Sequence, residues 1–377
     1  MNEQTSVRQI YLDYNATTPI DPKVADAMLP FLRKHFGNPS SDHKFGKIAK
    51  RALENARRQV AELINCKSDE VIFTSGGTES NNSALIGYAL ANKNKGNHII
   101  TSTIEHPAIM EVCRYLETRG FDVTYLQVDK FGMIDPENIA KNITSDTIMI
   151  SIMHANNEVG TIQPIEEIGK IARDHKICLH SDAAQSLGKI QVDVDKMNVD
   201  LLSIAGHKIY APKGVGALFV RDGIELDNIL HGAGQEKSRR PGTENILEIV
   251  GLGKACEIAK AESGRLSIMR DKLQKGISDI TKIKLNGHPI KRLPNTLNIT
   301  FEDHNNSLIS RISSEIAVSY GAACHSNTQE ISSVLKALDV KAEHAQKTIR
   351  FSLGRFTSES EIDEVVSIIS RLANEYS

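Results

Sequence analysis

The sequence predicts an α/β protein whose larger part is built on a mostly parallel, seven-stranded sheet, followed by a smaller α+β domain. Two observations lead to this prediction. Between about residues 71 and 220, short apolar runs typical of buried strands alternate with segments of helical periodicity. Past about residue 251 this alternation is replaced by a long helical pattern and a few short strands. A regular alternation of strands and helices is typical of a parallel sheet with helices on both faces.

The elements of the larger part are expected in a simple order along the chain. A first helix is predicted over residues 22–35, with Asp21 as its cap and Pro22 in its first position. Strands are expected at residues 71–74, 98–102, 122–127, 147–153, 177–181, 201–204 and 216–220. Further helices are expected at residues 47–64, 79–92, 107–119, 136–141 and 164–175. Ligands of such sheets gather at the carboxyl ends of the strands.

We expect two domains. The larger would span residues 13–250, and the smaller would combine residues 1–12 with residues 251–377. In the smaller domain the pattern predicts a long helix over residues 251–280, a strand near 295–301, and helices over 332–338 and 361–376.

Composition excludes several classes of protein. The net charge of -2 gives no sign of a nucleic-acid or other polyanionic partner. No apolar run approaches the roughly 18–20 residues that span a bilayer. The five cysteines are odd in number and contain no CxxC pair, which favours reduced thiols in a cytoplasmic compartment over a disulfide framework or a zinc site.

One lysine stands at an unusual place. The apolar run 199–204 ends at Gly206, and Lys208 follows directly after His207. A buried ammonium is costly unless it is paired or loses its charge. A lysine that forms an imine with pyridoxal phosphate (PLP) meets this condition, whereas in isolation Lys208 would be read as a surface residue of a loop.

Two further strand ends carry polar motifs. Gly76, Gly77 and Thr78 join a strand to a helix, where free amides and the helix dipole could bind a phosphate or simply form a capping turn. Asp182 ends another strand, three residues before Gln185. It could pair with a pyridinium nitrogen or serve as an ordinary helix cap.

Four other residues are candidates with an open alternative. His106 could stack on a planar ring and exchange protons, or be a loop histidine. The amides around Asn157 could bind a hydroxyl or a carboxylate. The polar loop 232–245 could be solvated, or could bring Thr243 to a phosphate across a dimer interface. Cys324 lies in a small-residue loop beside a histidine, which favours a reactive thiol over a structural one.

Taken together, these motifs resemble the class V aminotransferase group, and specifically the cysteine desulfurase/selenocysteine lyase family, whose fold is PLP fold type I. The resemblance runs from the N-terminal segment 10–18 to about residue 373. It includes Gly-Asn-Pro-Ser-Ser at 37–41, Arg-Leu-Pro-Asn-Thr at 292–296 and Ile-Arg-Phe-Ser-Leu-Gly-Arg at 349–355.

The resemblance implies a role for each candidate. Lys208 would hold PLP and act as the base, and His106 would stack on the ring. The other cofactor contacts would come from Asp182 at the ring nitrogen, Gln185 at the ring hydroxyl, Gly77, Thr78 and His207 at the phosphate, and Thr243 at the phosphate of the partner subunit. Arg350 and Asn157 would bind the substrate carboxylate, and Cys324 would accept the substrate sulfur as a persulfide.

The implied function is a cysteine desulfurase. It would convert L-cysteine to L-alanine and pass the sulfur to an acceptor or scaffold protein for iron–sulfur cluster or other thio-cofactor assembly, working as a homodimer. Two features depart from the usual desulfurase pattern. Ala205 replaces a phosphate-binding serine, and the sequence Gly-Ala-Ala-Cys-His-Ser around Cys324 resembles that of selenocysteine lyases. A selenocysteine lyase is therefore the alternative, and an aminotransferase of the same fold or an inactive docking scaffold is further removed.

Overall fold

The structure, a computed structural model, describes residues 9–259, 263–323 and 330–375. Its largest sheet has seven strands in the order β2-β8-β7-β6-β5-β3-β4. In chain order these are β2 (Val71–Thr74), β3 (His98–Ser102), β4 (Asp122–Leu126), β5 (Thr147–Ser151), β6 (Cys178–Asp182), β7 (Leu201–Ala205) and β8 (Gly216–Val220). Only β8 runs antiparallel to its neighbours, so the predicted mostly parallel, seven-stranded sheet is confirmed.

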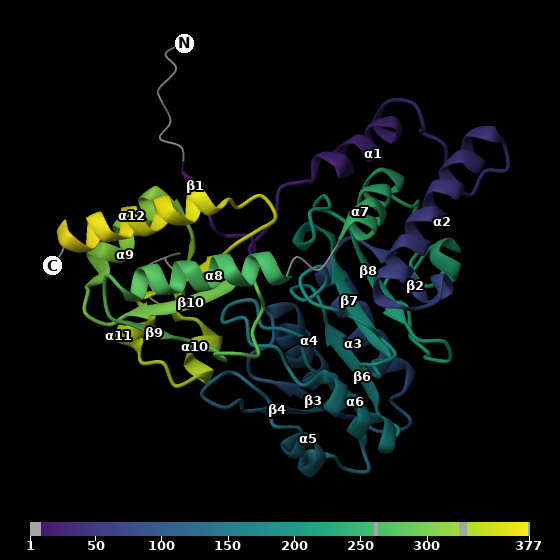
Figure 1. Ribbon diagram of the computed structural model, residues 1–377. Helices are drawn as coiled ribbons and strands as arrows, with labels where there is room; N and C mark the ends of the chain where they lie inside the picture. The colour runs from purple at the N-terminus through teal and green to yellow at the C-terminus, as the bar shows by residue number, and fades with distance from the viewer. Residues whose placement is uncertain (1–8, 260–262, 324–329, 376–377) are drawn as a thin grey trace.

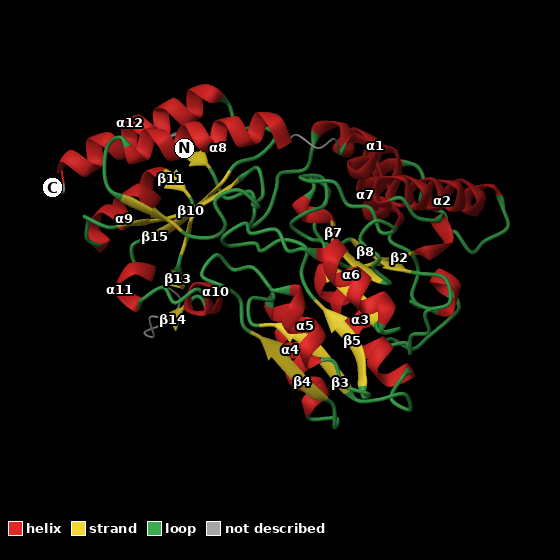
Figure 2. Ribbon diagram, turned by 60° about the horizontal axis from the view of Figure 1, so that its bottom comes forward, coloured by secondary structure: helices red, strands yellow, loops and turns green. Residues whose placement is uncertain are grey.

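Helices cover both faces of this sheet (Figure 2). One apolar cluster joins the sheet to residues of α1 (Pro22–Arg33), α2 (Lys44–Ile64), α5 (Pro136–Asn142), α6 (Ile165–Asp174) and α7 (Ile246–Ile258). A second cluster packs α3 (Gly77–Ala91) and α4 (Pro107–Glu117) against the opposite face. Successive residues of one strand, such as Ile72 and Phe73, belong to different clusters, because their side chains point to opposite faces of the sheet.

A smaller antiparallel sheet lies beside the large one (Figure 1). Its order is β12-β15-β10-β9, formed by β9 (Ile283–Leu285), β10 (Thr296–Phe301), β12 (Ser319–Tyr320) and β15 (Thr348–Ser352). Helices α8 (Ser263–Ser278), α9 (Asn306–Glu315) and α12 (Glu359–Glu375) pack in its apolar cluster. The remaining short elements are β1 (Ile10–Tyr11), which pairs with β11 (Ile316–Ala317), and β13 (Ala322–Ala323), β14 (Glu330–Ile331), α10 (Ser333–Ala337) and α11 (Ala342–Ala345).

The long helix expected over residues 251–280 is wrong. The structure has two helices here, because α7 ends at Ile258 and Ala259 is extended, with φ -69° and ψ 97°. The two helices pack in different clusters: Leu252 of α7 lies with the large sheet, and Leu273 of α8 lies with the small one. The division into two domains stays a prediction. Helix α7 packs with the large sheet and extends eight residues past the expected boundary at residue 250.

In the part of the chain that the structure describes, no helix combines the length and the apolar character needed to cross a membrane.

A buried ion pair fixes the loop after β8. Arg57 of α2 donates from Nη1 and Nη2 to the two carboxylate oxygens of Glu236, each at 2.7 Å. Glu236 Oε2 also accepts from the backbone N–H of Phe73 at 2.9 Å. The two side chains are only 7% and 3% exposed. Glu236, Lys237 and Ser238 all have positive φ, between 46° and 65°, so this pair holds a stretch of strained backbone in place.

Replacing Glu236→Ala leaves the Arg57 guanidinium buried without its partner. We expect the free energy of unfolding to fall by about 3–5 kcal/mol, the usual cost of breaking a buried pair from one side. Urea denaturation measures it. Asp69→Asn is the control, because it breaks the exposed ion pair of the neighbouring Lys237 and should leave the midpoint nearly unchanged. Equal midpoints for the two variants would contradict this role of the buried pair.

Candidate active site

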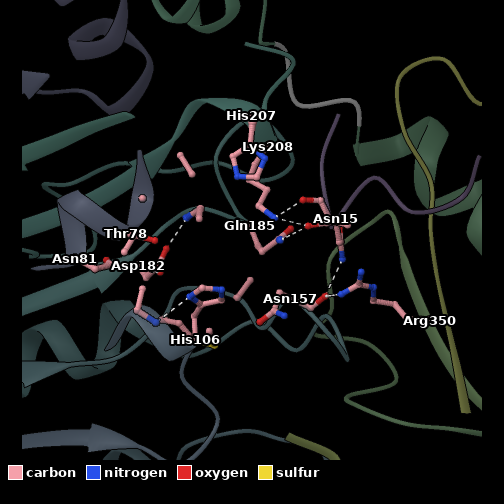
Figure 3. Close-up of a pocket in the computed structure, with 17 residues that line it drawn as sticks. Asn15, Thr78, Asn81, His106, Asn157, Asp182, Gln185, His207, Lys208 and Arg350 are labelled. Carbon is pink, nitrogen blue, oxygen red and sulfur yellow. Dashed lines mark hydrogen bonds between the residues drawn. The ribbon is translucent and has the colours of Figure 1, made fainter. Parts of the chain in front are cut away.

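A cavity of about 250 Å³, lined by several polar side chains, opens at the carboxyl ends of the large sheet's strands and faces the smaller sheet (Figure 3). The structure brings nine of the predicted site residues to its wall: Gly77, Thr78, His106, Asn157, Asp182, Gln185, His207, Lys208 and Arg350. They come from six separate segments of the chain. Their placement is a finding, whereas the role of each residue stays a prediction.

Lys208 follows β7 in a single 3-10 turn, and its amine faces the cavity. Nζ donates to the backbone carbonyls of Asn15 at 2.6 Å and Ala16 at 2.8 Å. Among the described residues no carboxylate forms an ion pair with it. Burial lowers the pKa of Lys208 to about 8, and the charge of Arg350 adds to this effect while Asp182 opposes it. A substantial fraction of the amine is therefore neutral, and hence nucleophilic, at mildly alkaline pH.

Asp182 ends β6 with its carboxylate at the cavity wall. Oδ2 accepts from Asn81 Nδ2 and Oδ1 accepts from the backbone N–H of Ala184, both at 2.8 Å. These two donors fix the orientation of a nearly buried carboxylate, so it serves as a turn cap and as a pocket residue at once. Asn81 Oδ1 is buried without a partner. Such an arrangement suits a ligand that presents a protonated ring nitrogen.

Two histidines at the wall have lowered pKa values, which favours the neutral imidazole. His106 is the N-cap of α4, and its Nδ1 accepts from the backbone N–H of Ala108 at 3.1 Å. That bond assigns the proton of the neutral ring to Nε2. Burial lowers the pKa of His106, an effect that Asp182 opposes and Lys208 reinforces. Burial likewise lowers the pKa of His207 to about 4, and its Nδ1 lies 3.1 Å from Thr17 Oγ1.

The first turn of α3 offers free amides to an anion. Its N-cap, Gly76, has φ +151° and makes no side-chain capping bond, so the helix start is left open toward the cavity wall at Gly77 and Thr78. A Cβ on Gly77 would lie 3.1 Å from Ala205 Cβ, so the helix approaches β7 closely here. Ala205 also lines the cavity. Its methyl group offers no hydrogen-bond donor, so the side chain at position 205 does not bind a phosphate.

Arg350 of β15 reaches the same cavity from the smaller sheet. Nη2 donates to Asp13 Oδ1 and Ser319 Oγ, each at 2.7 Å, and Nη1 donates to the Asn157 carbonyl at 3.0 Å. Nε is buried without a partner. Nη1 therefore keeps one N–H for a ligand. Both N–H groups of Nη2 are occupied, and one becomes available to a ligand only if Asp13 or Ser319 is displaced. A guanidinium in this setting suits a carboxylate ligand.

One predicted residue among those that the structure describes does not join this wall. Thr243 is exposed and lies outside the cavity of its own chain, as expected if it acts in a partner subunit. Cys324 lies outside the described residues.

Sequence reasoning missed Asn15, Asn81 and Lys189. Asn15 and Asn81 line the cavity, and Lys189 donates to Gln185 from behind the wall. Asn15 could have been found because it lies in the N-terminal segment 10–18, where the resemblance to the family begins. Asn81 lies one helical turn after Thr78 in α3, and Lys189 lies four residues after Gln185 in a run of turns.

Comparisons with known proteins agree along nearly the whole chain. The family model for class-V aminotransferases matches residues 10–365. The cysteine desulfurase IscS of Methanosarcina thermophila is 48% identical over 98% of this chain and 93% of its own length. That of Dictyoglomus turgidum is 48% identical over 97% of this chain and 94% of its own length.

Solved structures show the same likeness. A NifS-like protein superposes with a TM-score of 0.91 at 36% identity, covering 98% of this chain and all of the other. SspA in complex with cysteine gives 0.85 at 39% identity, covering 93% and 100%. Because the family model and these relatives extend over almost every residue, the chain belongs to the class V aminotransferase family.

Proposed function

We propose that this chain is a PLP-dependent cysteine desulfurase, which converts L-cysteine to L-alanine and delivers the sulfur through Cys324. One observation supports this function above the others: the Lys208 amine, the Asp182 carboxylate and the Arg350 guanidinium open into one cavity. The names of the relatives, cysteine desulfurase IscS, point the same way.

The residues that line the cavity suit each polar group of PLP. Lys208 would hold the cofactor covalently, Asp182 would bind the ring nitrogen and His106 would lie over the ring. The remaining contacts would be Gln185 at the ring hydroxyl and Gly77, Thr78 and His207 at the phosphate, with the partner subunit's Thr243. When bound, PLP supplies an electron sink for a negative charge that develops at the substrate Cα.

Residues of the chain would then orient the substrate and move its proton. Arg350 would bind the substrate carboxylate through its free Nη1 N–H, and through Nη2 once the carboxylate displaces Asp13. Asn157 would complete this contact. Lys208, whose pKa is lowered to about 8, would take the proton from Cα as a neutral base. The Nε2 N–H of His106 would donate to an acceptor in the cavity.

Cys324 would carry out the sulfur transfer. Its thiolate attacks the substrate sulfur, so that an S–S bond forms as the Cβ–S bond breaks. The carbon product leaves as alanine after protonation, and the enzyme keeps the sulfur as a persulfide. We propose that an acceptor or scaffold protein then takes this sulfur for iron–sulfur cluster or other thio-cofactor assembly.

We also propose that the enzyme is a cytoplasmic homodimer with sites at the interface. The four described cysteines are free thiols, in keeping with a reducing compartment. Thr243 lies outside its own cavity, so a second copy is needed to bring it to a phosphate. The Gly-Ala-Ala-Cys-His-Ser sequence keeps selenocysteine lyase activity as the alternative, which would appear as preference for selenocysteine when both amino acids compete at equal concentration.

Capture of PLP by the apoprotein should follow the ionisation of Lys208. We expect the rate to rise with pH and to level off above about pH 8, because only the neutral amine attacks the aldehyde. The absorbance of bound PLP measures it. Lys208→Ala should abolish covalent capture, and Lys213→Ala, at an exposed position, should not change it. A rate that rises only near pH 10 would show that Lys208 is an ordinary lysine.

Cys324→Ser should keep PLP bound but slow alanine formation from cysteine by about 100-fold or more, because a serine hydroxyl is not ionised near neutral pH. Amino-acid analysis measures alanine, and mass spectrometry locates the persulfide. Cys66→Ser is the control, since burial raises the pKa of the Cys66 thiol to about 12. Undiminished turnover by Cys324→Ser would eliminate the proposed sulfur transfer.

A further inference from the structure

Lys189 is a buried amine that the proposed reaction does not use. It lies one turn after Gln185, is 8% exposed, and among the described residues forms no ion pair with a carboxylate. Nζ donates to Gln185 Oε1 at 2.6 Å and to Asn15 Oδ1 at 3.2 Å. Burial lowers the pKa of Lys189 well below its usual value, and Lys208 and Arg350 add to this effect. A buried amine without a counterion is costly, so its two hydrogen bonds need a reason beyond packing.

The first of these bonds orients the Gln185 amide. Gln185 Nε2 donates to the Asn15 carbonyl at 2.9 Å, and that oxygen can only accept. Lys189 donates to the other end of the same amide. Both hydrogen bonds therefore require the same orientation of the amide, with Oε1 toward Lys189. Lys189 does not line the cavity, whereas Gln185 does, so the second N–H of Gln185 Nε2 remains available to a ligand in the cavity. A ligand atom beside Gln185 thus meets a donor.

The second bond supports the residue against which Lys208 rests. Asn15 is 1% exposed, and its carbonyl accepts from both Gln185 and Lys208 (Figure 3). Its side chain is held on all sides: Oδ1 accepts from Lys189 and from Asn295 Nδ2 at 3.0 Å, and Nδ2 donates to the Asn157 carbonyl at 3.1 Å. Lys189 therefore belongs to a chain of bonds that ends at the Lys208 amine.

We propose that Lys189 is a positioning residue of the cofactor site, which turns the Gln185 N–H toward the bound ring and holds Asn15 against Lys208. The inference rests on the proposed binding of PLP in this cavity. The acceptor that Gln185 meets is then the ring oxygen in its anionic form, because a hydrogen-bond donor favours the charged state.

Other charged and titratable groups face the same region and stay unchanged in the variants below. On the cavity side they are His106, Asp182, His207, Lys208 and Arg350, with Asp13 bound to Arg350. On the side of Lys189 they are Tyr14, Tyr210 and Arg355.

A double-mutant cycle tests the inference. Lys189→Met, Gln185→Leu and the double variant are compared with the parent for the PLP dissociation constant and for the pH midpoint of the bound-PLP absorbance. We expect Lys189→Met to weaken binding about tenfold and to raise the midpoint by about one pH unit, since the ring oxygen loses its donor. Gln185→Leu should raise the midpoint equally, and the double variant should raise it no further, because Lys189 reaches the ring oxygen only through Gln185.

Additive shifts of the pH midpoint in the double variant, or unchanged values for Lys189→Met, would overturn the inference. Lys196→Met, at an exposed lysine, is the matched control and should change neither quantity. Methionine fills the same space without a buried amine, so the loss of stability should be limited to that of the two hydrogen bonds. If Lys189→Met does not fold, Lys189→Leu gives the same readouts. Failure of the parent protein to bind PLP would instead refute the proposed function.

Discussion

The site depends on a half-buried amine that, among the described residues, forms no ion pair with a carboxylate. Lys208 follows the fully buried strand β7 in a short turn, and its Nζ donates to two backbone carbonyls. Carbonyl acceptors satisfy its donors but stabilise the ammonium less than a carboxylate would, and burial therefore lowers its pKa. Asp182 and Asp13 lie near enough to influence the amine but are themselves held by Asn81 and Arg350. The result is a nucleophile produced by the fold alone.

The N-terminal segment connects the two halves of this site. Asp13 binds Arg350 of the smaller sheet, Asn15 binds Lys208 and Gln185, and Thr18 donates its backbone N–H to the His207 carbonyl. A carboxylate that binds Nη2 of Arg350 must compete with Asp13, which lies in the same segment as Asn15. This short segment therefore contacts both the guanidinium that we propose binds the substrate carboxylate and the amine that we propose takes the proton.

Much of this could be predicted from sequence, because strand ends and turn residues leave local signals. Lys208, Asp182 and His106 follow apolar runs that the structure forms as β7, β6 and β3. Partners such as Asn81 for Asp182 leave none, since a hydrogen bond across 101 positions has no periodic pattern. The break after Ile258 was missed because the following residues continue the helical pattern without proline or glycine until Gly264. Lys189 carries no signal in the sequence that singles it out, and only its packing reveals a buried amine.

The central claim is that Lys208, and not another lysine, forms the covalent bond to PLP. Reducing the PLP-loaded protein with borohydride fixes the cofactor on its lysine, and tandem mass spectrometry of the peptides then identifies the residue. The account predicts one modified peptide, with the added mass on Lys208. Modification of Lys189, of a surface lysine, or of no lysine would contradict it.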